Sequence, residues 1–389
     1  MKKIILCAAA LLLPFLLIGC SAQADAGAGE CEGYDDGLVI VVGVHANQPA
    51  PNVPATLACS IEKTIAGGGS IGVIASDGEP TVLVPAQAFE VDGNNPATTR
   101  NNTIAAINLV IGSIQQAKPR VAGSNLYAAL TLAADLARTA TPVISTVVVI
   151  DAGLPDRGAV DLTVDGGTLV SSEQLVEHLT TAGALRDDTF AGLRFDFWGL
   201  GYTSRPQEPL ANSQTNNITR LWPALVVAGG GTSTAVPLPR EGDPVDTTLE
   251  TGVVEVIEPP VLDVASGTVL TFDSTSALGF ASGASELLDS SAATTALAPV
   301  VTWLTEEAGR TATITGRTDS DQPELNGPLS LARATTVADL LVSLGVSRDA
   351  LSIMGAAYTA SPPDRLVDGT LDPYAAALNR VTEIALAGR

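Results

Sequence analysis

Uninterrupted apolar runs alternate with amphipathic stretches along the first half of the chain. Such runs are typical of strands buried on both faces, and apolar residues three and four apart are typical of helices with one buried face. The predicted strands are residues 38–44, 70–75, 145–150 and 193–200. The predicted helices are residues 104–116, 125–138, 172–182 and 216–227. This alternation predicts an α/β domain over residues 37–240, with a doubly wound, mostly parallel sheet.

The last third of the chain, residues 265–389, has a different order of elements. Its predicted strands are residues 269–273, 311–315, 351–356 and 381–385, with amphipathic helices at 284–307 and 330–344. In the second helix, Ala334, Val337, Ala338 and Leu341 form an apolar stripe. The pattern predicts an α+β domain of βαβαββ order, with both helices on one face of a small sheet.

An acidic segment with several prolines, residues 241–264, separates the two predicted domains. Charged, proline-bearing segments are typical of linkers between domains. We therefore expect residues 241–264 to be an inter-domain linker, partly recruited into the second domain.

The beginning of the chain predicts export. Lys2 and Lys3 precede an apolar run over residues 4–18, which is short for a membrane span of about twenty residues but suits a signal peptide. The run ends in Leu-Ile-Gly-Cys at Cys20, which resembles a bacterial lipobox. The resemblance implies a lipoprotein signal peptide over residues 1–19 and an acyl lipid, such as palmitate, on Cys20. An ordinary signal peptide with a chance cysteine is the alternative.

The lipobox resemblance also implies where the mature protein resides. It would be exported and lipid-anchored at the periplasmic face of an outer membrane or the outer face of a plasma membrane. Residues 20–36, which are rich in Ala, Gly and acidic residues, would form a flexible tether to that membrane.

The cysteines support a disulfide. Cys7 lies in the signal peptide and Cys20 would carry the lipid, which leaves Cys31 and Cys59. In an oxidising compartment two remaining thiols are expected to pair. Their spacing matches no zinc-binding motif, so a metal site is the weaker alternative.

The charge of the chain limits its ligands. Asp and Glu number 42 and Lys and Arg number 20, so the formal net charge is −22. This excess repels nucleic-acid phosphates and excludes binding through a broad basic patch. Any anionic ligand must therefore be held by a local arginine.

Residues 314–346 contain the strongest candidate for such a site. Asp319 follows a predicted strand, and Arg333 lies in the first turns of the next helix, for which Asn326 and Ser330 are candidate N-caps. A carboxylate can accept from an ammonium group while a guanidinium grips a carboxylate, so the pair suits a zwitterion. The alternative is that Asp319 and Arg333 bond only to each other.

The same residues resemble the OmpA-like peptidoglycan-binding domain, over about residues 265–389. The matching positions are Gly316, Thr318, Asp319, Asn326, Leu329, Ser330, Arg333 and Ala334, with Phe272, Leu278, Gly283 and Leu287 before them and Asn379, Arg380 and Val381 at the end. The resemblance implies that Asp319 and Arg333 hold the ammonium and carboxylate of diaminopimelate in the peptide stem of peptidoglycan. The candidate ligand-binding residues are Asp319, Arg333, Asn326, Thr318, Leu325 and Arg380.

The chain departs from the OmpA-like pattern at several places. Arg317 replaces the usual histidine, no glycine follows Thr318-Asp319, and the loop to Asn326 is one residue shorter. These changes affect the loop geometry and the expected preference among stem peptides.

The first domain resembles von Willebrand factor A domains. Residues 38–47 and 147–153 resemble their first and fourth strands, and the segment starting at Gly123 resembles the one that supplies a metal-binding threonine. The metal motif itself is degenerate, since residues 43–47 read Gly-Val-His-Ala-Asn and only Ser124 and Asp151 offer ligands. We expect no divalent metal and no cofactor, which leaves this domain to bind an unknown protein partner.

Enzymatic chemistry has little support in the sequence. His45, Asp151 and Ser124 form the one triad-like trio, without a nucleophile-elbow motif. We therefore expect a non-enzymatic cell-envelope lipoprotein that anchors to peptidoglycan and binds no nucleic acid. The alternative is an adhesion or signalling protein whose N-terminal domain does the work, with the OmpA-like part only a degenerate anchor.

Overall fold

The computed structural model of the chain describes residues 31–238, 242–257, 264–274, 276–281, 283–358, 363–366 and 368–388. The predictions for the signal peptide, for Cys20 and for the tether up to residue 30 lie outside these residues. In the part of the chain that the structure describes, no helix is both long enough and apolar enough to span a bilayer.

The N-terminal domain is built on a six-stranded sheet of order β3-β2-β1-β4-β7-β8. Its strands are β1 Gly37–Gly43, β2 Ser70–Ser76, β3 Thr81–Gln87, β4 Thr146–Ile150, β7 Arg194–Trp198 and β8 Thr232–Val236. All neighbouring pairs are parallel except β2–β3, which is antiparallel. The strand order reverses between β1 and β4, as in doubly wound sheets. The predicted mostly parallel α/β sheet is confirmed.

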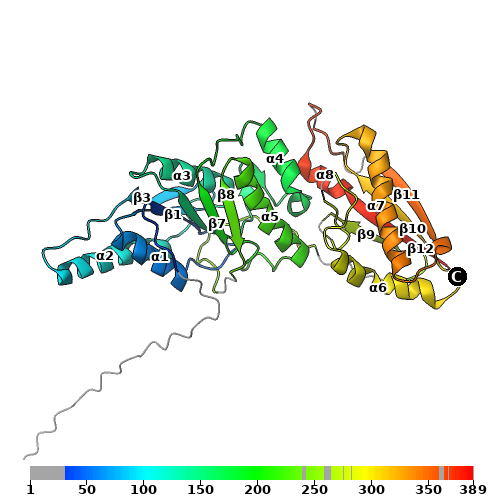
Figure 1. The fold of residues 1–389 in the computed structure, drawn as a ribbon, viewed down its shortest axis with the longest axis horizontal. Helices are drawn as coiled ribbons and strands as arrows, with labels where there is room; N and C mark the ends of the chain where they lie inside the picture. Colours follow the sequence, from blue (N-terminus) through cyan, green and yellow to red (C-terminus); the bar gives the residue numbers. More distant parts are fainter. Residues whose placement is uncertain are drawn as a thin grey trace, which may run out of the picture.

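Helices cover both faces of this sheet (Figure 1). They are α1 Ala55–Ala66, α2 Pro96–Gln115, α3 Leu126–Thr139, α4 Ser172–Thr181 and α5 Asn212–Ala228. Every residue of β1 is buried because apolar side chains of α1 and α2 pack on one face and those of α3 and α5 on the other. The short elements β5 Asp156–Arg157, β6 Val160–Asp161 and the 3-10 turn η1 Gly167–Leu169 lie between β4 and α4.

The predicted disulfide forms between Cys31 and Cys59, with Cα atoms 6.1 Å apart. It ties the beginning of the described chain to α1. This bond confirms the pairing expected from the cysteine count.

The described part of the linker, residues 242–257, packs on the first domain. Thr251 Oγ1 accepts from Ala46 N at 3.2 Å, and Val254 N donates to Gln207 Oε1 at 2.8 Å. Val254 is buried in the core of that domain. Residues 242–257 therefore belong to the first domain, whereas Val264, at the end of the predicted linker, packs against the core of the second, so the expected partial recruitment is confirmed at that end only.

The C-terminal domain has a four-stranded sheet of order β11-β10-β12-β9. The strands are β9 Val269–Asp273, β10 Thr311–Thr318, β11 Leu351–Tyr358 and β12 Val381–Ala387. The helices are α6 Ser290–Glu306, α7 Pro323–Ser343 and α8 Pro373–Asn379, with a 3-10 turn η2 Arg348–Ala350. Buried side chains of α6 and α7 form one core with those of β9, β10 and β12. The predicted order holds, with α8 added between β11 and β12.

Two predicted helix starts in this domain are wrong. α6 begins at Ser290 instead of residue 284, since Asp289 Oδ1 caps it by accepting from Ser291 N and Ala292 N, both at 2.9 Å. α7 begins at Pro323, whose fixed φ suits the first turn of a helix. Asn326 and Ser330 therefore lie inside α7 and are not N-caps.

The two domains contact each other through α8 and α4 (Figure 1). Ala377 of α8 is buried in the core of the N-terminal domain, and Tyr374 and Leu378 pack against it. The Tyr374 hydroxyl accepts from Asp161 N at 3.3 Å. The domain interface thus continues the core of the first domain.

Candidate functional site

The candidate ligand-binding residues all line one cleft of about 1250 Å³ between the two domains. α7 and the β10–α7 loop form one side of it, and α4 and α5 contribute to the opposite side. Thr318 ends β10 and is buried, whereas Leu325 is half exposed. The sequence therefore identified residues that gather in space, but it did not predict that the first domain closes their site.

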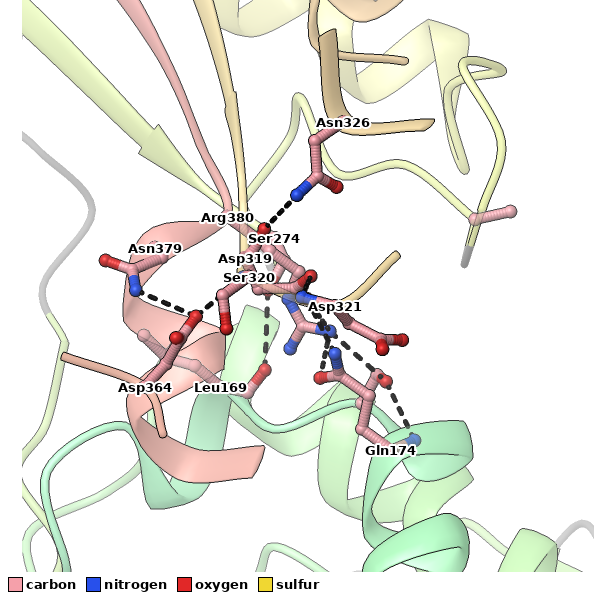
Figure 2. A network of polar contacts seen from close by, with 12 residues as sticks. Leu169, Gln174, Ser274, Asp319, Ser320, Asp321, Asn326, Asp364, Asn379 and Arg380 are labelled. Atoms are coloured by element: carbon pink, nitrogen blue, oxygen red, sulfur yellow. Dashed lines mark hydrogen bonds and ion pairs between the residues drawn. The ribbon is translucent and has the colours of Figure 1, made fainter. Parts of the chain in front are cut away.

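Asp319 lies at the centre of the polar network in this cleft (Figure 2). The residue is 8% exposed. Its Oδ2 accepts from Gln174 Nε2 at 2.6 Å, and Arg380 Nη1 lies 3.8 Å from the same oxygen. Burial raises the pKa of the Asp319 carboxyl, while the Arg380 charge and the Gln174 bond act in the opposite direction.

Arg380 is the nearest cation to Asp319. Its Nη1 donates to Gln174 Oε1 and, at 3.4 Å, to Ser171 Oγ. Its Nε and Nη2 groups are buried and have no hydrogen-bond partner among the described residues. Burial lowers the pKa of Arg380, partly offset by Asp319. A buried guanidinium with unpaired donors is suited to bind an anion, to which it can donate hydrogen bonds.

Arg333 lines the cleft, and the alternative that it bonds only to Asp319 is wrong. It forms no ion pair with Asp319; its Nε donates to Ala284 O at 2.9 Å and its Nη2 to Ala281 O at 3.3 Å. The guanidinium carbon is 5.2 Å from the ring centroid of Phe280. Burial, followed by the Arg380 charge, lowers the pKa of Arg333 to about 10, so it stays charged at neutral pH.

The loop that carries Asp319 is held from both ends. Asn326 Nδ2 donates to Asp319 O at 2.8 Å, which gives Asn326 a supporting position instead of a direct place beside the carboxylate. Asp364 Oδ2 accepts from Ser320 N at 2.7 Å and from Asn379 Nδ2 at 3.2 Å (Figure 2). The end of α8 is therefore connected to the loop through Asp364.

Asp364 and Gln174 contribute to this network and were missed from the sequence. Asp364 lies in a stretch without regular periodicity, whereas its partner Asn379 belongs to the terminal motif and so had a signal. Gln174 belongs to another domain, and no local pattern indicates such a contact.

The carboxyl edge of the N-terminal sheet holds the degenerate metal motif. His45 Nε2 is 3.5 Å from Asp151 Oδ1, and both residues are buried. Ser124 is also buried and contacts neither of them through a hydrogen bond or ion pair in the described structure. Nowhere in the described ranges do three or more His, Cys, Asp or Glu side chains gather as a metal site would require.

Comparison with known proteins identifies the C-terminal domain. Residues 279–365 match the OmpA family. They include Asp319, Asn326 and Arg333, whereas Arg380 lies beyond the matched range. No curated protein sequence matches the chain.

Several solved structures are similar to parts of the chain. The peptidoglycan-associated lipoprotein from Burkholderia pseudomallei is 23% identical over 28% of this chain and 86% of its own, with a TM-score of 0.24. The OmpA-like domain of FopA1 from Francisella tularensis is 22% identical over 31% of this chain and 71% of its own, with a TM-score of 0.23. An aerotolerance-related membrane protein from Bacteroides fragilis is 17% identical over 51% of this chain and 90% of its own, with a TM-score of 0.27.

Proposed function

We propose that the protein is a non-enzymatic envelope lipoprotein that attaches non-covalently to peptidoglycan through its OmpA family domain. In this proposal Asp319 accepts from the ammonium group of diaminopimelate, and Arg380 and Arg333 bind its carboxylate. The observation that carries the proposal is the buried Asp319 carboxylate beside Arg380, whose Nε and Nη2 donors lack partners among the described residues.

The chemistry of the site favours a zwitterion over a simple anion or cation. A single cation would leave Arg380 unneutralised, and a single anion would face the Asp319 charge. Each charge-assisted hydrogen bond contributes about 1.5–3 kcal/mol, so a few of them give weak attachment. The very high local concentration of a wall polymer then makes weak attachment sufficient.

The membrane anchor and the role of the N-terminal domain are inferred from the sequence. Lipid on Cys20 would hold the protein to a membrane, and the N-terminal domain, von Willebrand A-like without its metal motif, would bind a protein partner. In the described structure Ser124 Oγ bonds to neither His45 nor Asp151, so the trio lacks the arrangement of a catalytic triad, which supports a non-enzymatic role for that domain.

Co-sedimentation with purified peptidoglycan tests the proposal. We expect wild type to sediment with walls whose stems contain diaminopimelate, and Asp319→Asn to remain in solution. Glu324→Gln removes an equal charge from an exposed position near the site and is expected to sediment as wild type does. Equal sedimentation of wild type and Asp319→Asn would show that the binding site lies elsewhere.

The ligand is tested by exchanging the wall. Walls whose stems carry lysine keep the side-chain ammonium group but lack the second carboxylate. If the protein binds them as well as it binds diaminopimelate walls, the zwitterion assignment is wrong.

A further inference from the structure

The N-terminal domain occupies the proposed peptidoglycan site with one of its own side chains. Gln174 lies in the first turn of α4, and its amide nitrogen donates to Asp319 Oδ2 at 2.6 Å. Its amide oxygen accepts from Arg380 Nη1. Gln174 is itself buried, at 9% exposure.

The amide of Gln174 reproduces the bonding pattern of the proposed ligand. It presents a donor to the carboxylate and an acceptor to the guanidinium, as the ammonium and carboxylate of a zwitterion would. Each Gln174 bond has one charged partner, whereas each bond of a zwitterion would have two, so the ligand adds an attraction between opposite charges that the neutral amide lacks. A ligand can therefore displace it.

The rest of the interface is centred on α8. Ala377, Tyr374 and Leu378 of this helix pack on the first core, and Asp161 N donates to the Tyr374 hydroxyl at 3.3 Å. Ser274 Oγ donates to Leu169 O at 3.4 Å, which is a long bond. Separation of the domains exposes the apolar side chains of α8, a cost that ligand binding has to offset.

α8, which docks on the first domain, also supports the binding loop. Its last residue, Asn379, bonds Asp364, which in turn accepts from Ser320 N beside Asp319. The docking helix and the loop that carries Asp319 are therefore joined within the C-terminal domain.

We propose that docking of the N-terminal domain and binding of the wall peptide at Asp319 are mutually exclusive, with Gln174 as an internal competitor. This inference rests on the proposed function. If only undocked molecules bind, the apparent affinity for peptidoglycan is the affinity of the undocked form multiplied by the fraction of molecules that are undocked. More stable docking therefore weakens the apparent binding. A partner that draws the N-terminal domain away would raise that affinity.

Quantitative co-sedimentation of the full mature chain tests the competition. Gln174→Ala removes the competing amide, and Tyr374→Ala weakens docking at a position outside the peptide site. We expect both to bind diaminopimelate-type peptidoglycan about fivefold more tightly than wild type does. Thr180→Ala, an exposed change on the same helix, is the matched control and should bind as wild type does.

X-ray scattering in solution gives a readout that does not depend on the wall. We expect a larger radius of gyration for Gln174→Ala and Tyr374→Ala, and for wild type after addition of a soluble diaminopimelate muropeptide. Since binding linkage is reciprocal, the ligand must open the protein if opening promotes binding.

The outcomes separate the two proposals. If Asp319→Asn loses binding but Gln174→Ala and Tyr374→Ala bind as wild type does, competition is refuted and the proposed function stands. Weaker binding by a folded Gln174→Ala would instead make Gln174 part of the ligand site and also refute competition. If neither wild type nor the two opened variants bind peptidoglycan, the proposed function fails.

Discussion

Gln174 of the N-terminal domain and Asp319 of the C-terminal domain share a 2.6 Å hydrogen bond, from Nε2 to Oδ2. This bond joins α4 of the N-terminal domain to the candidate binding loop of the C-terminal domain (Figure 2). The proposed ligand site therefore lies at the contact between the domains, so ligand binding there depends on how the domains are arranged.

Acidification should release the protein from peptidoglycan at a higher pH than an ordinary aspartate predicts. Burial raises the Asp319 pKa above its usual value of 3.8, and a neutral carboxyl cannot pair with an ammonium group. We expect sedimentation to decline as the pH falls through this raised pKa. A midpoint at or below 3.8 would contradict the argument.

The same shift predicts an opposite trend in stability. Because the folded pKa is raised, the native protein takes up this proton before the unfolded chain does, so the Asp319 contribution to stability increases as pH falls through that window. Asp319→Asn lacks the titration, and its unfolding midpoint relative to wild type should be highest near neutral pH. Thermal unfolding of both proteins across pH measures the difference.

Alkaline pH should undock the domains through Tyr374. Burial raises the pKa of this hydroxyl from 10.0 to about 12, so the docked form keeps a proton that the exposed phenol would lose. Between these values docking weakens with rising pH, by up to about 3 kcal/mol. We expect the radius of gyration of wild type to increase in this range, and that of Tyr374→Phe to change much less.

The close packing of β10 on α7 should be intolerant of a single methyl group. A Cβ on Gly316 would lie 2.1 Å from Ser330 O, whereas one on Gly327, within α7, would meet nothing within 4 Å. We expect Gly316→Ala to lower the free energy of unfolding by about 1–3 kcal/mol. Gly327→Ala should raise it by about 0.5–1 kcal/mol because alanine favours the helix. Urea unfolding that shows equal effects would contradict the packing.

Loss of the Cys31–Cys59 disulfide should destabilise the N-terminal domain. The bond closes a loop of 28 residues. Its removal increases the conformational entropy of the unfolded chain, which lowers the free energy of unfolding by about 3 kcal/mol. We expect a lower unfolding midpoint for the double variant Cys31→Ser/Cys59→Ser, and no further change when a reductant is added to it. An unchanged midpoint would show that the chain is otherwise tied down at Cys31.

Much of the fold could be predicted because its strands have distinct burial patterns. β1 is buried throughout and therefore reads as a continuous apolar run, and β10 alternates between buried and more exposed positions. The edge strands β3 and β8 were missed because they are partly exposed and carry mixed residues. α8 was missed because it is short and its apolar side is buried by the other domain.

The sequence indicated which C-terminal residues gather at the candidate site, but not which residues they contact there. Motif spacing brought Thr318, Asp319, Asn326 and Arg333 together, since they belong to neighbouring elements. The direction of the Arg333 head depends on Ala281, Ala284 and Phe280, which lie some fifty residues earlier. Sequence spacing carries no information about such contacts, nor about Gln174.

Calorimetric titration with a soluble diaminopimelate-containing muropeptide measures binding of the stem peptide without the wall polymer. We expect saturable binding to wild type, tighter binding to Gln174→Ala and none to Asp319→Asn. Equal affinity of Asp319→Asn and wild type would show that the peptide does not bind at Asp319.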